Sequence, residues 1–80
     1  MPNNNAEQMV ESVIREARAQ LHKKLEEAGL TQTQLAELVG LPSSSVQRAL
    51  APNGNQVPSL RQLCQIADGL GVQLYIVVDG

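Results

Sequence analysis

The sequence has almost none of the residues that build redox, metal or aromatic sites. Tyr75 is the one aromatic residue, Cys64 the one cysteine and His22 the one histidine. A single thiol cannot close an internal disulfide, and one cysteine with one histidine gives too few ligands for zinc. No nucleophile stands near a base at a workable spacing. We therefore predict no catalysis, no metal and no cofactor, and we expect a reducing compartment, the cytoplasm.

Long apolar runs are also absent. No stretch approaches the ~18 consecutive apolar residues that a membrane-spanning helix needs. Residues 1–5 lack the basic and apolar parts of a signal peptide, and we expect them to form a disordered tail. The 80 residues suffice for one small domain whose stability is marginal unless its helices pack well or a second subunit helps.

Charge is scarce in the middle of the chain. The formal net charge is −2, whereas DNA-binding domains are usually basic. Between Thr31 and Pro58 only Glu37 and Arg48 are charged. A segment rich in Gln, Ser and Asn can still contact nucleic acid through polar side chains and backbone N–H groups. Such binding would depend only weakly on salt, because few phosphates are neutralised.

Apolar residues at steps of three and four predict a long first helix over residues 6–28, which Gly29 ends. Its apolar stripe comprises Val10, Val13, Ile14, Ala17, Leu21, Leu25 and Ala28. The pair Lys23-Lys24 precedes Glu26-Glu27, which favours a solvated helix end over contacts with a polyanion.

Two short helices are predicted next. Thr31 and Gln34 have the spacing of a capping box, which begins a helix that ends at Gly40. Its expected buried residues are Leu35, Ala36, Leu38 and Val39. A third helix begins at Ser43 or Ser44, where a serine is expected to cap it, and ends at Leu50. Val46, Ala49 and Leu50 point inward in this helix.

The remaining chain changes character twice. Residues 51–58 contain two prolines and an Asn-Gly step, which predict a loop. Ser59 and Gln62 have the spacing of a second capping box, and a fourth helix runs to about Leu70. Its inward residues are Leu60, Leu63, Ile66, Ala67 and Leu70. Val72, Leu74, Ile76 and Val78 then alternate with other residues, which predicts a strand.

The stretch Gln32–Leu50 resembles the helix-turn-helix of the Cro/repressor-type (XRE) family. The likeness lies in Gln32, Ala36, Gly40 and Val46 at the family's spacing, and it extends from about Leu21 to Val72. It implies an all-α, lambda-repressor-like domain of four helices (residues 6–71), to which this chain adds a C-terminal strand (residues 72–80). The departures are that strand, the long loop and the single basic residue in the third helix.

The resemblance also implies which residues contact double-stranded DNA. Gln32 matches the position that anchors a phosphate, and the exposed face of residues 43–50, the recognition helix, enters the major groove. The expected DNA-contacting residues are Gln32, Thr33, Ser43, Ser44, Ser45, Gln47, Arg48, Asn53 and Asn55. Gln pairs well with adenine and Arg with guanine.

The C-terminal strand predicts a homodimer, because an isolated apolar strand has two unpaired edges. The same strand of a second copy is its simplest partner. The expected interface residues are Val72, Leu74, Tyr75, Ile76 and Val78, and the first helix offers an alternative surface at Val10, Val13 and Ile14. His22 is expected at the surface near the DNA or the dimer, and Cys64 is expected half-buried and inert.

The sequence thus favours a dimeric transcriptional repressor that binds a near-palindromic operator. The alternative is an antitoxin or protein-binding subunit that neutralises a toxin through its C-terminal strand. An enzyme or enzyme accessory is the weakest hypothesis, because no catalytic set is present.

Overall fold

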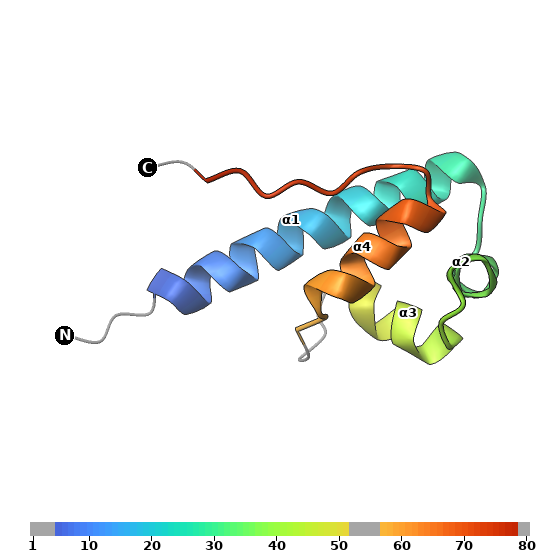
Figure 1. Cartoon of the computed structure of the whole chain (residues 1–80), viewed down its shortest axis with the longest axis horizontal. Coiled ribbons are helices and arrows are strands. Elements are labelled where there is room, and N and C mark those ends of the chain that lie inside the picture. The colour runs from blue at the N-terminus through green and yellow to red at the C-terminus, as the bar shows by residue number, and fades with distance from the viewer. Residues whose placement is uncertain (1–4, 52–56, 79–80) are drawn as a thin grey trace.

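The computed structural model of the chain describes residues 5–51 and 57–78, and within these residues α-helix is the only regular secondary structure (Figure 1). The four helices are α1 (Asn5–Ala28), α2 (Gln32–Val39), α3 (Ser43–Leu50) and α4 (Leu60–Gly69). Residues 1–4 of the expected tail lie outside the described part, and Asn5 is the first residue of α1. Among the described residues, no helix has the length and apolar character needed to cross a membrane.

Only the C-terminal half of α1 belongs to the core. Ala17, Leu21 and Leu25 are buried there, whereas Val10 and Val13 keep 38% and 43% of their surface exposed. α1 continues beyond the other three helices, so its first turns have few neighbours (Figure 1). The apolar stripe predicted from the sequence is therefore real, but about half of it remains uncovered in the single chain.

Helix α2 begins and ends where the sequence predicted. Thr31 Oγ1 accepts a hydrogen bond from the Gln34 N–H at 3.1 Å, and Gln34 Oε1 accepts one from the Thr31 N–H at 2.9 Å. At the other end Gly40 has φ +73°, which glycine adopts at little cost. The Leu41 N–H then donates to the Ala36 carbonyl at 3.1 Å. The Gly40 conformation and the Leu41 bond together end α2 and lead the chain into α3.

The core lies where α2, α3 and α4 meet the C-terminal half of α1. Its largest fully buried side chains are Leu35, Val46, Leu50, Leu63 and Ile66. Two residues predicted to point inward do not: Leu38 is 63% exposed and Leu60 is 54% exposed. Leu38 and Leu60 each lie on a short helix that buries fewer residues than predicted, so no neighbouring helix covers their side chains.

Gly69, near the end of α4, marks the closest approach between α4 and α2. A Cβ atom placed at Gly69 would overlap with Cγ1 of Val39 and would lie 3.2 Å from Cδ1 of Leu35. Ala36, which was predicted to be buried, is indeed buried. Gly69 had no predicted role, and the absence of a side chain there allows the two helices to touch.

We expect the substitution Gly69→Ala to lower the free energy of unfolding by about 1–2 kcal/mol. Alanine favours a helix over glycine by about 1 kcal/mol, whereas overpacking costs about 1–3 kcal/mol, and an overlap with the stiff Val39 side chain puts the cost in the upper part of that range, about 2–3 kcal/mol. Urea denaturation measures the difference, and Asp68→Ala, at an exposed position of the same helix, is the control. A Gly69→Ala variant as stable as the wild type would mean that Val39 moves aside freely.

The predicted C-terminal strand is not formed within the described part of the single chain. Residues 72–78 are extended but belong to no β-ladder, and they run beside α1 (Figure 1). Val72 and Leu74 pack against the core, whereas Ile76, Val77 and Val78 are 55%, 84% and 91% exposed. A strand requires a second strand to pair with, and the period-two pattern alone supplies none. We call residues 72–78 the C-terminal segment.

Candidate nucleic-acid interface

Helix α3 has one buried face and one polar face. Val46, Ala49 and Leu50 are at most 2% exposed and fix the helix to the core. The exposed residues on the other side are Ser43, Ser44, Gln47 and Arg48. Their side chains are hydrogen-bonding groups of the kinds that contact base edges in the major groove. A short polar helix held on a rigid support is the geometry that groove recognition requires.

The N-terminus of α3 differs from the prediction. Pro42 is the N-cap residue, and it provides no side-chain hydrogen bond, so neither Ser43 nor Ser44 caps the helix. Proline's fixed φ suits this position, where φ is −60°, and the helix therefore begins one residue earlier than a serine cap would allow. Both serine side chains are exposed and remain available for contacts outside the chain.

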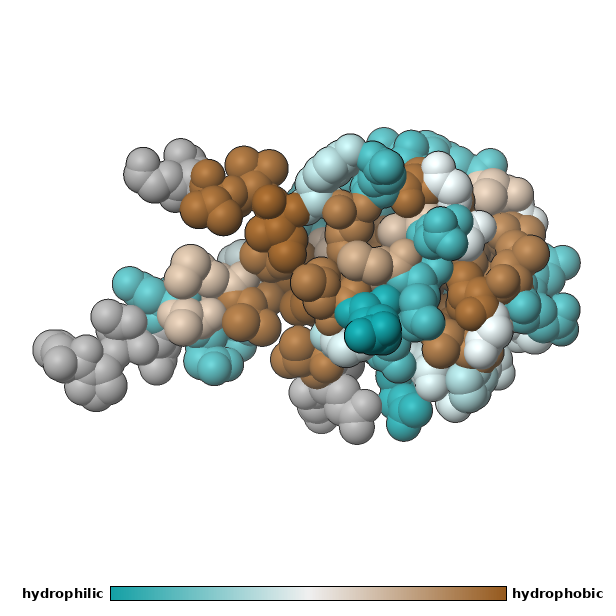
Figure 2. All heavy atoms as spheres, in the orientation of Figure 1, coloured by the Kyte–Doolittle hydropathy of each residue, from teal (hydrophilic) through white to brown (hydrophobic). Residues whose placement is uncertain are grey.

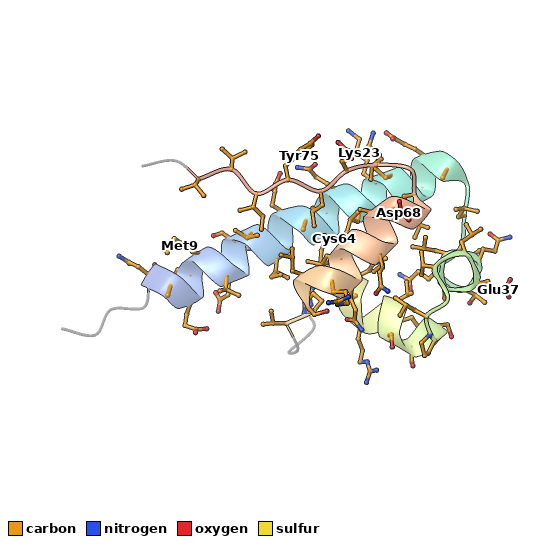
Figure 3. The ribbon with its side chains drawn as sticks, viewed as in Figure 1. Met9, Lys23, Glu37, Cys64, Asp68 and Tyr75 are labelled. Carbon is orange, nitrogen blue, oxygen red and sulfur yellow. The ribbon has the colours of Figure 1, made fainter. Side chains whose placement is uncertain are left out.

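Helix α2 places two more of the predicted residues near its N-terminus. Gln32 is half-buried and Thr33 is exposed, and both follow the Thr31 cap. Glu37, the only acidic residue of α2, points away from the molecule at the outer side of that helix (Figure 3). Exposed polar groups on α2 and α3 thus lie on consecutive elements around the Gly40 turn.

A small cleft of about 150 Å³ lies between α3 and the start of α4. It is lined by Ser45, Arg48, Ala49, Val57, Pro58 and Gln62. Ser45 and Arg48 were predicted to contact DNA, whereas Gln62 was predicted only as a capping partner. Ser59 Oγ accepts the Gln62 N–H at 3.0 Å, so half of the predicted capping box is present. The predicted contacts Asn53 and Asn55 lie outside the described residues.

Arg61 is a further basic residue that was not among the predicted DNA contacts. It is exposed in the first turn of α4, next to Gln62. The scarcity of basic residues could have identified it, because Arg48 and Arg61 are the only Lys or Arg residues after residue 30.

The C-terminus of α3 is held by two side chains of α1. Arg18 Nε donates to the Ala49 carbonyl at 2.9 Å, and His22 Nε2 lies 2.6 Å from the Leu50 carbonyl, to which it donates. His22 was predicted at the surface but is half-buried, because its ring turns toward α3. Arg18 was missed, although it lies on the apolar stripe between Ile14 and Leu21, where a charge is unexpected.

Cys64, predicted half-buried, is exposed. The described residues contain no cluster of His, Cys, Asp and Glu side chains that could hold a metal ion. Lys24 pairs with Glu27 at 3.2 Å at the end of α1, where both side chains are exposed; the sequence predicted a solvated helix end there but not this ion pair.

A large apolar groove lies between α1 and the C-terminal segment. It has a volume of about 950 Å³, extends along α1 from Ala6 to Lys24 and reaches the start of α4 at Pro58, which also lines the cleft. Apolar atoms gather along this segment and toward α1, whereas hydrophilic residues are common at the opposite end (Figure 2). Of the predicted dimer residues, Val72 and Leu74 are half-buried, and Tyr75, Ile76 and Val78 are exposed. Met9 is also exposed at the free end of α1 (Figure 3).

The comparison with protein-family models agrees with this architecture. Residues 14–74 match the model of a helix-turn-helix domain, which includes all of α2, α3 and α4. No curated protein and no solved structure matches the chain. Because the match covers most of the sequence, the chain belongs to the helix-turn-helix domain family, within the Cro/repressor-type (XRE) group.

Proposed function

We propose that the protein is a dimeric, sequence-specific DNA-binding regulator that acts as a repressor. The observation that carries the proposal is the exposed polar face of α3, which is fixed to the core by Val46 and Leu50. In this proposal Gln47 and Arg48 contact base edges, and Ser43, Ser44 and Ser45 contact bases or phosphates nearby. Gln32 and Thr33, at the start of α2, contact the DNA backbone.

We infer dimerisation because the DNA-contacting surface of a single chain, the exposed face of α3, is small. One eight-residue helix with a single basic residue contacts too few base pairs to select one site in a genome. Two copies related by a two-fold axis would place their α3 helices about 34 Å apart, in successive major grooves of a near-palindromic operator. Bound there, the dimer would block access of polymerase. Since DNA is the partner, we place the protein in the cytoplasm.

The second copy is proposed to bind the apolar surface formed by the C-terminal segment and the first turns of α1. The segment carries no charge, and its outer residues Ile76, Val77 and Val78 are more than half exposed. Apolar surface of this kind is a common mark of a protein–protein contact. Pairing two C-terminal segments in antiparallel fashion would satisfy their backbone groups and cover Val10 and Val13 of α1.

A protein partner is the alternative occupant of the same surface. In that hypothesis the chain is an antitoxin or binding subunit, and the C-terminal segment adds a strand to a toxin. Sedimentation of the purified chain separates the two hypotheses. A dimer supports self-association, whereas a monomer that co-purifies with a second polypeptide through residues 72–79 favours the toxin-binding hypothesis.

We expect the affinity for DNA to fall gently with salt. Arg48 and Arg61 are the only Lys or Arg residues after residue 30, so a dimer brings about four positive charges to the DNA with these helices. A plot of the logarithm of the association constant against that of the salt concentration should have a slope of about −3 to −4. Fluorescence anisotropy with a labelled duplex measures this slope. A slope steeper than about −7 would require contacts from other cations, such as Lys23.

A further inference from the structure

Helix α3 ends differently from the other three helices. α1, α2 and α4 are each followed closely by a glycine with φ near +70°, namely Gly29, Gly40 and Gly71. At such a glycine the backbone N–H groups that follow turn back onto the last carbonyls of the helix. α3 is followed by Ala51 in an extended conformation, with φ −65° and ψ 119°. Its last carbonyls therefore need partners from elsewhere.

Two of those partners come from α1. Ala49 and Leu50 are the last two residues of α3, and their carbonyls accept hydrogen bonds from Arg18 Nε and His22 Nε2. Arg18 and His22 are four residues apart, so they lie on one face of α1. Each hydrogen bond joins two residues about thirty positions apart in the sequence, so both are tertiary contacts and not local ones.

Arg18 is buried at the C-terminus of α3. Arg18 is only 7% exposed, so its charge is largely removed from water, which is tolerated only with close polar partners. Consistent with this, no buried side-chain nitrogen or oxygen in the described part of the chain lacks a hydrogen-bond partner. The negative end of the α3 dipole also lies at these two carbonyls and favours a cation there.

We propose that Arg18 and His22 are positioning residues that fix the recognition helix for DNA reading. In this proposal Arg18 and His22 do not contact DNA. They fix the positions of Ala49 and Leu50, and therefore also the positions of the neighbouring Gln47 and Arg48. α3 has two turns and no side-chain cap at either end, so these two bonds replace the missing C-cap. The DNA-reading part of this inference rests on the proposed function, whereas the hydrogen bonds themselves do not.

The first arm of the test needs no DNA. Amide hydrogen exchange is followed by NMR in the wild type, His22→Leu and Arg18→Met, with His22→Gln as the matched variant that keeps an N–H donor at a similar reach. His22→Leu and Arg18→Met are expected to lose at least about fivefold in protection at residues 47–50, with little change in α2 and α4. His22→Gln should stay within about twofold of the wild type. Equal loss of protection in every helix would overturn the proposal.

The second arm measures the ratio of affinities for a selected operator and for random duplex. Partial unfolding weakens both affinities equally and leaves the ratio unchanged, whereas a misplaced α3 lowers the ratio. We expect a fall of at least about tenfold in His22→Leu and recovery in His22→Gln. A selective loss of protection in α3 with an unchanged ratio would contradict the positioning role.

The two arms separate this inference from the proposed function. If the wild type binds no DNA, the proposed function fails, and hydrogen exchange alone decides whether Arg18 and His22 hold α3. If Arg18→Met does not fold, His22→Leu decides the matter, because His22 is only half-buried and its replacement is the milder change.

Discussion

The double substitution of Gln47 and Arg48 by alanine is expected to abolish specific DNA binding and leave the fold intact. Both side chains are exposed on α3, and neither contributes to the buried face formed by Val46, Ala49 and Leu50. A good bidentate contact between a side chain and a base is worth about 1–3 kcal/mol, and a dimer loses two copies of each. We expect the operator affinity to fall at least about a hundredfold in a gel-shift or anisotropy titration.

The matched control replaces Gln8 and Arg15 by alanine. It removes one amide and one positive charge per chain from exposed positions of α1 that are not on the polar face of α3. If DNA binding depended only on net charge, this control would lose as much affinity as the α3 variant. Equal losses, or no loss in the α3 variant, would show that α3 is not the reading element. Thermal unfolding of both variants confirms that each is folded.

The second large effect is expected at the C-terminal segment. Ile76→Asp places a charge in the proposed dimer surface, where it would be desolvated without a partner. Ile76 is 55% exposed in the single chain, so the monomer itself should tolerate the change. We expect sedimentation to show a monomer, and the operator affinity to fall at least about tenfold because only one half-site is bound at a time.

Leu38→Asp is the control for this experiment, because Leu38 is an exposed aliphatic residue on α2, outside the apolar groove. It should leave the oligomeric state unchanged. Ending the chain after Leu74 is a second variant, which keeps Val72 and Leu74 in contact with the core. If both C-terminal variants remained dimeric, the interface would lie elsewhere, and Val13→Asp on α1 would be the next substitution to measure.

The helices and most of their ends could be predicted because their signals are local, although the expected serine cap of α3 is absent. The Thr31–Gln34 capping box, the Gly40 turn and the buried Val46 each depend on residues within a few positions of one another. The family match at residues 14–74 confirms the resemblance inferred from the same residues. Their roles toward DNA remain predictions.

The features that sequence reasoning missed depend on contacts between distant residues. Arg18 and His22 meet carbonyls about thirty residues away, and Gly69 matters only because α2 crosses α4 at that point. The C-terminal segment shows the same limit. Its alternating pattern describes a strand that has a partner, but the pattern does not say which chain supplies it.

Selection from randomised duplex DNA with the purified protein, at about 100 mM salt, tests the central claim most directly. The Gln47→Ala, Arg48→Ala double variant is selected in parallel. We predict that the wild type enriches a near-palindrome whose half-sites lie about one helical turn apart and that the variant enriches nothing. A folded wild-type protein that enriches no sequence would contradict the account and leave the apolar surface, with a protein partner, as the functional part of the molecule.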